Sequence, residues 1–365
     1  MGDVLLIYNK IVKEDLEEIY SRNIPWEQMD GKTVLITGPY GMLSSYMTAM
    51  LIYLNEEKEY NIRIIAVVKS IEKFQKRFGE YVDRSYVRVV PSMLDGKINI
   101  KGDVDYIIHA ASYASGNYYK LYPVDTMKPN VLGTYYLLEL AKEKQSDGFL
   151  FFSSGDIYGK IIDLESISET DIGVLDTLDE HSCYGESKRL AETMCRAYYN
   201  QYKVPAMMLR IFPTYAPTMD IQNDPRAVAT FVKDVVNGND IVLKSSGAKR
   251  MSFCYIADAI AGYFMVLLKG VRGDAYNVCN SKEFYQVKEL AEIIASLSRE
   301  AKSKVVMIPR SIDEPYIEND FQSWLRPSDE KLRNLGWKPH FDTKAGFKRV
   351  IDYFTLYSGK SFERN

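Results

Sequence analysis

Cysteine is scarce in this chain, and the cysteines that occur lie far apart. They are Cys183, Cys195, Cys254 and Cys279, and none has the CxxC spacing that zinc and redox sites use. We therefore predict no metal site, and we expect the thiols to act as small buried hydrophobic side chains. Together with an N-terminus unlike a signal peptide, this pattern favours a reducing cytoplasm.

Long apolar runs and an excess of charge of one sign are also missing. Apolar runs such as Ala261–Leu268 fall far short of the roughly 20 residues that span a bilayer, so no membrane association is expected. The formal net charge is -3, whereas nucleic-acid binding rests on clustered lysine and arginine. A small molecule is therefore the expected partner.

What the chain does contain is a regular alternation of elements from Lys32 to about Phe212. Short β-branched runs alternate there with helical stretches, which is typical of βαβ units and a parallel sheet. The 365 residues leave room for a second, smaller domain. The predicted strands are Thr33–Thr37, Ile62–Val68, Tyr86–Val90, Tyr106–His109, Phe149–Ser153 and Ala206–Ile211.

The segments on either side of this region differ from it. Residues 1–30 are charged and amphipathic and are predicted to form an N-terminal helical extension. Residues 213–365 alternate less regularly and are predicted to form predominantly a smaller, mixed α/β substrate-binding domain. The elements predicted there are a helix over Val228–Val236, short strands near Ile241–Leu243 and Met251–Tyr255, a helix over Val287–Ser298, and a helix, a turn and a final helix over Lys331–Phe354.

A glycine turn joins the first predicted strand to an apolar helix in the sequence TVLITGPYGMLS, residues 33–44. Gly38 allows a tight turn, Gly41 lets the backbone approach a pyrophosphate, and the amides around Tyr40 and Met42 face its charge. Ser44 takes the place of a third glycine. Residues 31–212 are thus predicted to be a doubly wound Rossmann α/β domain that binds a dinucleotide, although glycine turns also occur without any ligand.

The end of the second strand bears on the choice of dinucleotide. An NAD enzyme usually carries an acidic residue there for the ribose 2′-hydroxyl, but this chain has Lys69. A lysine pairs with a 2′-phosphate, so NADP stays open beside NAD as the cofactor. The alternative is a solvated lysine at the end of a strand.

Three later residues form a catalytic pattern. Ser154 ends the fifth strand, and Tyr184 and Lys188 are four residues apart, so on a helix they share one face. An ammonium near a phenol favours the phenolate, which can then take a hydroxyl proton, while the serine orients the same oxygen. The alternative is a chance YxxxK on an exposed helix, but the chain order favours an active site that also includes Asp156.

With these motifs the sequence resembles the extended short-chain dehydrogenase/reductases that modify nucleotide sugars, and it looks closest to their UDP-glucuronate decarboxylase branch. The matching stretches are DYIIHAAS (105–112), GNY (116–118), NVLGT (130–134), CYGESKRLAETMC (183–195), RIF (210–212), NDPRAV (223–228) and LGW (335–337). The resemblance implies a nucleotide-diphosphate sugar as substrate, a homodimer built on a four-helix interface, and a role in a glycan pathway.

The resemblance also implies roles for single residues. Ala110, Ala111 and Ser112 are expected to line the cofactor, as are Tyr184 and Lys188. Asn130 is expected on the cofactor side too, where it supports the active-site hydrogen bonds. Asn117 and Tyr118 are expected on the substrate side.

Departures from the family pattern concentrate on that substrate side. Gly155-Asp156 replaces the Asp-Glu pair of the dehydratases, which disfavours a 4,6-dehydratase. Met251 stands where the decarboxylases have an arginine; in an extended strand its neighbour Arg250 would point to the opposite face, whereas a local bulge would let it substitute. Pro213 and Thr218 replace an asparagine and an arginine that meet the sugar and the diphosphate.

Three arginines are left as candidates to hold a diphosphate: Arg226, Arg250 and Arg326. The alternative for each is a solvated side chain. Pro213 is predicted to line the sugar site. Of the histidines, His109 is expected to be a structural residue beside the cofactor and His340 to be solvated, whereas His181 receives no role.

The leading hypothesis is an NAD(P)-dependent nucleotide-sugar epimerase or related C4 oxidoreductase that works through a 4-keto sugar. Asp156 is then a second acid or base at C5 or C3, or only a polar contact. A nucleotide-sugar decarboxylase is the first alternative. A non-catalytic NAD(P)-binding regulatory module is the alternative from another class, although it has no need of Ser154, Tyr184 and Lys188.

Overall fold

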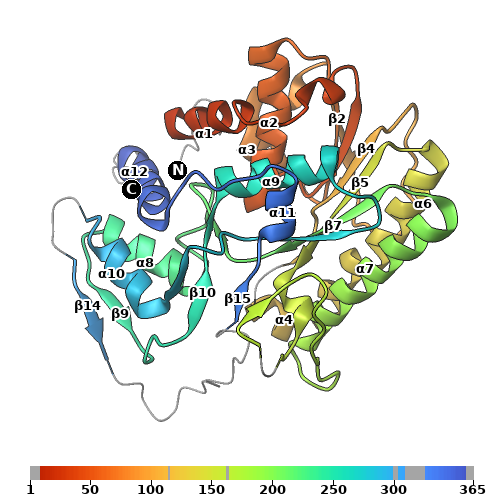
Figure 1. Ribbon diagram of the computed structural model, residues 1–365. Helices are drawn as coiled ribbons and strands as arrows, with labels where there is room; N and C mark the ends of the chain where they lie inside the picture. Colours follow the sequence, from red (N-terminus) through yellow and green to blue (C-terminus); the bar gives the residue numbers. More distant parts are fainter. Residues whose placement is uncertain (1–8, 114–115, 162–163, 299–302, 309–324, 359–365) are drawn as a thin grey trace.

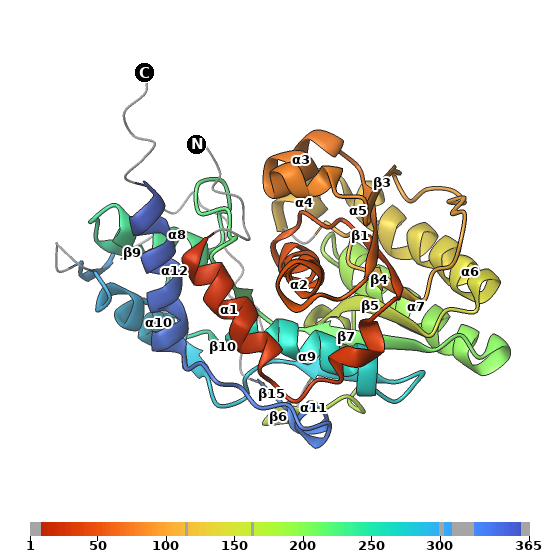
Figure 2. The ribbon, with the colours of Figure 1, turned by 90° about the horizontal axis from the view of Figure 1, so that it is seen from above.

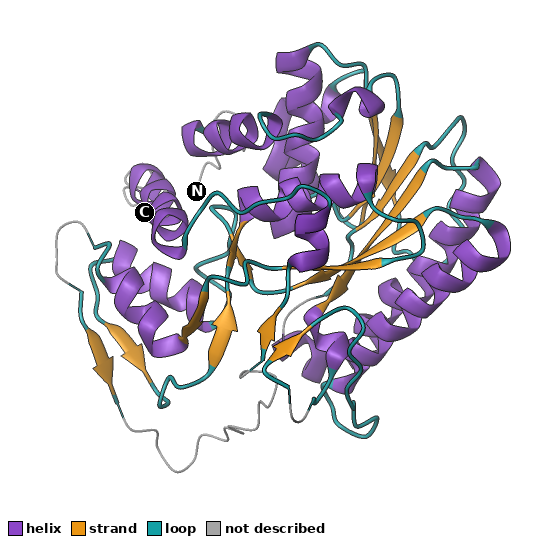
Figure 3. Cartoon of the chain, in the orientation of Figure 1, coloured by secondary structure: helices purple, strands orange, loops and turns teal. Residues whose placement is uncertain are grey.

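A single parallel sheet forms the centre of the molecule (Figures 1 and 3). The computed structural model describes residues 9–113, 116–161, 164–298, 303–308 and 325–358. The strand order is β12-β7-β5-β4-β1-β2-β3, and the neighbouring pairs are parallel. The strands are β1 (Thr33–Thr37), β2 (Arg63–Val68), β3 (Val87–Pro91), β4 (Tyr106–His109), β5 (Gly148–Ser154), β7 (Ala206–Ile211) and β12 (Ala275–Val278).

The alternation of side chains along the strands builds one apolar cluster on each face of this sheet. In β1, Ile36 joins the cluster beneath α2 (Met42–Lys58) and α9 (Ile256–Lys269), whereas Leu35 joins the one beneath α6 (Thr134–Lys144) and α7 (Ser182–Tyr202). Successive strand residues point to opposite faces, so both faces of every central strand are buried. The predicted doubly wound Rossmann fold is confirmed.

The sheet has one strand that the sequence analysis did not predict. β12 pairs with β7 at the edge of the sheet, and α9 packs on the sheet as well. Both come from the part of the chain after residue 212. The predicted domain boundary at residue 212 therefore stays a prediction about function, because residues after it add a strand to the central sheet and a helix that packs on it.

Beyond the sheet, short paired strands and helices form the second half of the molecule (Figure 1). The predicted strand near Met251–Tyr255 is two strands, and each has its own partner: β10 pairs with β13, and β11 pairs with β8. The elements of this half are β8 (Thr214–Tyr215), α8 (Ala227–Val236), β9 (Ile241–Leu243), β10 (Arg250–Ser252), β11 (Cys254–Tyr255), β13 (Phe284–Gln286), α10 (Val287–Ala295), β14 (Val305–Met307), β15 (Arg326–Pro327), α11 (Glu330–Asn334) and α12 (Thr343–Ser358).

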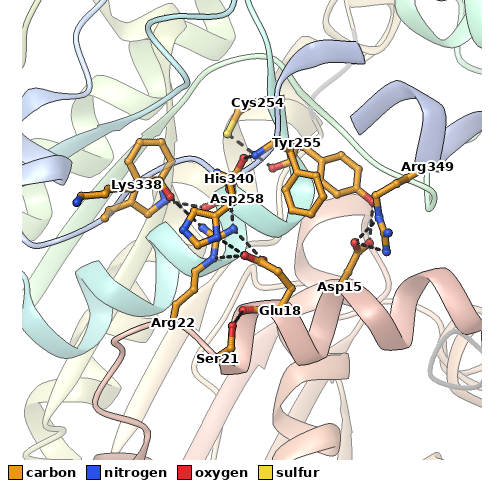
Figure 4. Close-up of polar contacts among 12 residues, drawn as sticks. Asp15, Glu18, Ser21, Arg22, Cys254, Tyr255, Asp258, Lys338, His340 and Arg349 are labelled. Atoms are coloured by element: carbon orange, nitrogen blue, oxygen red, sulfur yellow. Dashed lines mark hydrogen bonds and ion pairs between the residues drawn. The ribbon is translucent and has the colours of Figure 1, made fainter. Parts of the chain in front are cut away.

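The N-terminal extension contains α1 (Lys10–Tyr20), which lies between α2 and α12 (Figures 1 and 2). Its buried Asp15 accepts hydrogen bonds from the hydroxyls of Tyr46 on α2 and Tyr255 on β11, at 3.0 and 2.7 Å. Arg349 Nε on α12 donates to the same carboxylate at 2.9 Å (Figure 4). α1 is thus fastened to both halves of the molecule.

A second polar cluster follows one turn further along α1. Arg22 bonds Asp258 on α9 at 2.6 Å and Glu18 at 2.8 Å (Figure 4). His340 was expected to be solvated; its ring is half-exposed, but Nδ1 lies 2.6 Å from Glu18. The histidine therefore has a partner on α1.

The described residues contain no helix that is long and apolar enough to cross a membrane. Within the same residues, no group of histidine, cysteine, aspartate or glutamate side chains has the arrangement of a metal site. Cys195, Cys254 and Cys279 are buried and Cys183 is partly buried, and all four thiols are free.

Candidate active site

The glycine turn between β1 and α2 lies against the end of β4. Gly38 has φ +61°, and a Cβ on it would lie 3.1 Å from Ala111 Cα. Ser44 Oγ donates to the Gly38 carbonyl at 2.5 Å and would be 2.9 Å from a Cβ on Gly41. No described side chain caps α2, so the amides of its first turn remain available to an anion. These features fit a dinucleotide pyrophosphate.

The end of β4 is held by a buried hydrogen-bond chain. The amides of Ala110 and Ala111 donate to Thr37 Oγ1 at 3.1 and 3.0 Å, and His109 Nδ1 lies 3.0 Å from the same oxygen. His109 Nε2 lies 3.0 Å from the Pro129 carbonyl, which can only accept. Burial, with a smaller contribution from the charge of Lys188, lowers the pKa of His109 to about 3. The imidazole is therefore neutral and structural, as expected.

Lys69 and Tyr118 both contact Tyr113. Lys69 Nζ donates to the hydroxyl of Tyr113 at 2.7 Å, and Tyr113 stacks on Tyr118 with ring centroids 4.0 Å apart. The exposed lysine thus has a partner within the chain. Tyr118 was predicted on the substrate side, but the contacts place it in this aromatic group, and its role there stays a prediction.

The ring that contacts Tyr184 is Tyr119, on α4 (Gly116–Leu121). The two rings stack with centroids 4.7 Å apart and 12° between their planes. Sequence reasoning selected the neighbouring Tyr118, because the matching stretch GNY ends at that residue and Tyr119 lies just outside it. Asn117 precedes them, and its side chain lies outside the described residues.

Ser154, Tyr184 and Lys188 come together where β5 ends and α7 begins. Lys188 Nζ donates to the Phe152 carbonyl at 2.6 Å and lies 5.6 Å from the centre of the Tyr184 ring. Both side chains are buried, with 2% of Lys188 and 6% of Tyr184 exposed. Tyr184 and Lys188 thus share one face of α7, as the four-residue spacing predicted, and their catalytic role stays a prediction.

Burial dominates the proton affinities of this pair. It lowers the pKa of Lys188 to about 7. It also raises the pKa of Tyr184 well above the usual value; the charge of Asp156 adds to that rise, and polar contacts with the hydroxyls of Ser154 and Tyr119 oppose it. Because burial disfavours either charge alone, a protonated Lys188 and an ionised Tyr184 would stabilise each other by their opposite charges.

Asn130 lies in a short π-helix, Pro129–Gly133, behind the pair. Its Nδ2 donates to Ser187 Oγ at 3.0 Å, and Ser187 in turn donates to the Tyr184 carbonyl at 2.9 Å. Asn130 Oδ1 is buried without a hydrogen-bond partner in the described part of the chain. A single π turn is frequent at functional sites, and an orphaned acceptor fits a polar group from outside the chain.

Asp156 lies in a 3-10 turn, Gly155–Tyr158, that follows β5. The backbone amide of Asp156 donates to Ser154 Oγ at 3.2 Å. Asp156 is an exposed residue. Desolvation by the surrounding protein raises the pKa of Asp156, and the positive charge of Lys249 opposes the rise most strongly. Sequence reasoning did not identify Lys249.

The three candidate arginines separate into two places. The charge of Arg226 acts on Tyr119 and Tyr184, although its guanidinium also pairs with Asp224 at 2.9 Å. Arg250 and Arg326 instead both lie over the ring of Phe284, at 5.2 and 5.4 Å. Arg226 thus acts electrostatically on the two stacked tyrosines, whereas Arg250 and Arg326 share the ring of Phe284.

Two residues that depart from the family pattern, Thr218 and Pro213, form hydrogen bonds to other segments of the chain. Thr218 Oγ1 donates to the Met42 carbonyl, at the first turn of α2, at 3.1 Å. Pro213 accepts a bond from the Cys254 amide at 3.0 Å, which places it between β7 and β11. The role of Pro213 at the sugar stays a prediction.

Comparisons with known proteins agree with this geometry. The model of the NAD dependent epimerase/dehydratase family matches residues 34–279. The chain is 30% identical to UDP-glucuronic acid decarboxylase 6 of Arabidopsis thaliana over 89% of this chain and 90% of that protein. UDP-glucose 4-epimerase of Thermotoga maritima, solved with UDP-glucose, shares 20% identity and a TM-score of 0.70 over 89% of this chain and 99% of that one. dTDP-glucose 4,6-dehydratase of Bacillus anthracis, solved with NAD, shares 19% identity and a TM-score of 0.69 over 90% and 98%.

Proposed function

Because this chain belongs to the NAD-dependent epimerase/dehydratase family, we propose that it is a nucleotide-sugar epimerase or a related C4 oxidoreductase that works through a 4-keto sugar. The observation that carries the proposal is the buried contact of Lys188, Tyr184 and Ser154 beside a turn that fits a pyrophosphate. NAD, the cofactor of the family, supplies the acceptor and donor of hydride when it is bound.

The side chains of this site supply the proton transfers. Tyr184 takes the proton of the sugar C4 hydroxyl, since Lys188 favours its phenolate, and later returns that proton. Ser154 Oγ, which contacts the Tyr184 hydroxyl, orients the same sugar oxygen. Tyr119 covers the ring of Tyr184 and excludes water from one of its faces. Arg226, on the substrate side, favours an anionic group near the phenol.

Decarboxylation of a nucleotide-linked sugar acid is the second candidate. The identity of 30% to a UDP-glucuronic acid decarboxylase over nine-tenths of both chains favours it. Asp156 occupies the place of the decarboxylase glutamate in the motif. Against it, Met251 replaces an arginine of the decarboxylase motif, and Arg250 does not substitute for it, because its guanidinium lies on Phe284.

A homodimer formed through α6 and α7 completes the proposal. Apolar side chains on the outer surface of these helices and of the π-helix before them are exposed, notably Leu132, Tyr135 and Leu190. A second copy of the same helices would cover them in a four-helix interface. The free thiols support a reducing compartment such as the cytoplasm.

The test is to incubate the protein and NAD with a panel of UDP-, GDP-, CDP- and dTDP-linked sugars and to follow product mass and NMR. An unchanged mass with an inverted stereocentre supports epimerisation, loss of carbon dioxide means decarboxylation, and loss of water means dehydration. Tyr184→Phe is the control and should remove any turnover seen. No turnover with any sugar would contradict the proposal.

A further inference from the structure

Lys69 connects the end of one strand of the sheet to the segment that follows another. It comes directly after β2, and its Nζ donates to the Tyr113 hydroxyl at 2.7 Å. Tyr113 follows β4, which ends at His109. In the order β4-β1-β2, β1 lies between these two strands, and the carboxyl ends of parallel strands share one edge of a sheet. The contact therefore bridges the carboxyl end of β1, where the glycine turn begins.

The end of β2 is also bonded to that turn. The Gly38 amide donates to the Val67 carbonyl, two residues before Lys69, at 2.9 Å. In a Rossmann domain the pyrophosphate lies at this turn, and the residue at the end of the second strand meets the adenosine ribose. An acid there accepts a hydrogen bond from the 2′-hydroxyl of NAD, whereas a cation accommodates the 2′-phosphate of NADP.

The charge at this place is positive, and its surroundings preserve it. The hydrogen bond with Tyr113 raises the pKa of Lys69, so the ammonium persists at neutral pH. Its hydrogen-bond partner in the described part of the chain is a phenol and not a carboxylate. The carboxylate whose charge reaches it is that of Asp125, which bonds Lys128 at 2.9 Å. Lys69 is exposed, and its ammonium has three donors, so it can bond an anion and keep Tyr113.

Tyr113 holds the lysine in place because its own ring is packed. It stacks on Tyr118 of α4 with ring centroids 4.0 Å apart and 16° between the planes, and Tyr118 packs against Tyr122 at 4.9 Å. Lys69 Nζ also lies 5.4 Å from the centre of the Tyr113 ring. A lysine held in one position loses less conformational freedom when it binds an anion. The Tyr113 hydroxyl, which accepts from Lys69, still has its own proton to donate.

We propose that Lys69 and Tyr113 form a binding site for the 2′-phosphate of a dinucleotide, so that this chain binds NADP more tightly than NAD. The inference rests on the dinucleotide site of the proposed function and adds the choice of cofactor. It sets the chain apart within a family that depends on NAD. A lysine in place of the usual acid removes the acceptor for the ribose 2′-hydroxyl and supplies a charge that only the phosphorylated ribose matches.

Titration calorimetry with NAD and NADP measures this preference on the full-length protein freed of bound nucleotide. We expect NADP to bind the wild type at least about 10-fold more tightly than NAD. Lys69→Glu should weaken NADP by about 100-fold or more, because it replaces an attraction by a repulsion, and should leave NAD within about 3-fold. Lys69→Arg should keep the preference. Tyr113→Phe, which keeps the stacked ring, should weaken NADP alone by about 3-fold.

Lys101→Glu is the matched control for the change of charge. Lys101 is exposed and lies in the loop that enters β4 at its amino end, so both affinities should stay within about 2-fold there. Adenosine 2′,5′-bisphosphate and 5′-AMP, used as competitors, locate the preference on the ribose. The bisphosphate should bind the wild type more tightly than 5′-AMP does, and this difference should disappear in Lys69→Glu.

Equal or tighter binding of NAD by the wild type would overturn the proposal. A preference for NADP that survives in Lys69→Glu, or that is lost to the same extent in Lys101→Glu, would overturn it too. If neither dinucleotide binds, the proposal fails together with the proposed function. If NADP is preferred through Lys69 but no sugar is turned over with either dinucleotide, the proposed function fails while the assignment of Lys69 stands.

Discussion

At the scale of single residues, the burial of Lys188 beside Tyr184 lowers the stability of the folded state. An ammonium in an apolar environment is costly to the folded state, and here burial is what lowers the pKa of Lys188 to about 7. The same desolvation makes its charge act strongly on the phenol. In the proposed function, the lysine therefore serves catalysis at a cost to the stability of the fold.

Lys188→Met should separate these two effects. We expect the proposed activity to fall by roughly 10²- to 10⁴-fold, while the protein melts at a higher temperature at pH 6 to 7. The pKa of Lys188 is lower in the folded than in the unfolded chain, so the folded state binds fewer protons above pH 7 and wild-type stability rises with pH. The advantage of the variant should therefore shrink between pH 7 and 10.

Differential scanning calorimetry at pH values from about 6 to 10 measures the melting temperatures of the variant and of the wild type. Thr193→Met on the exposed part of the same helix is a suitable control, since it introduces the same side chain without removing a charge. A Lys188→Met protein that is less stable than wild type at pH 6 would show that the contact with Phe152 outweighs the cost of the buried charge.

At the scale of elements, the first βα turn gives the sharpest test of cofactor binding. Gly38→Ala and Gly31→Ala both place a side chain at positive φ, +61° and +71°, and should each lose about 1 kcal/mol of stability. Only at Gly38 would the new Cβ meet another residue, 3.1 Å from Ala111, whereas no described atom lies within 4 Å at Gly31. We expect NAD affinity to fall at least 10-fold in Gly38→Ala alone.

Titration calorimetry with NAD, alongside urea unfolding of both variants, gives the comparison. Equal affinities in the two variants would mean that the turn at Gly38 does not approach the cofactor closely.

The same elements show how far the sequence could predict the structure. The central strands and the spacing of Tyr184 and Lys188 depend on local patterns, and the predicted sheet and the contact between these two residues follow from them. β12 was not predicted, because its four residues form a strand only through their pairing with β7. Tyr119 was missed because its importance depends on stacking with Tyr184, which is far away in the chain.

At the scale of the whole molecule, α1 connects the two halves through a buried carboxylate. Burial raises the pKa of Asp15 to about 6, with Arg349 and the hydroxyls of Tyr255 and Tyr46 opposing the rise. The folded chain therefore holds a proton on Asp15 more tightly than the unfolded chain does. By linkage, this group's contribution to stability is present below about pH 4 and is lost as the pH rises through 6.

Asp15→Asn should remove the loss of stability that accompanies ionisation of Asp15. Because asparagine resembles the protonated acid, we expect the variant to exceed wild type at pH 7 by up to roughly 2–3 kcal/mol and to match it near pH 4. Arg349 keeps Glu14 and the Ile11 carbonyl as partners in the variant. Urea unfolding at several pH values measures the difference. A variant less stable than wild type at pH 7 would show that the ion pair with Arg349 outweighs desolvation.

The position of α1 also has a consequence for biosynthesis. Asp15 and its partner Arg349 are 334 residues apart in the chain, whereas Asp15 and Tyr46 on α2 are only 31 residues apart. α1 can therefore dock on α2 early in synthesis, but its ion pair with α12 cannot form until residue 349 has been made. A chain cut before α12 would keep the contact of α1 with α2 and would leave the buried Asp15 without its cation.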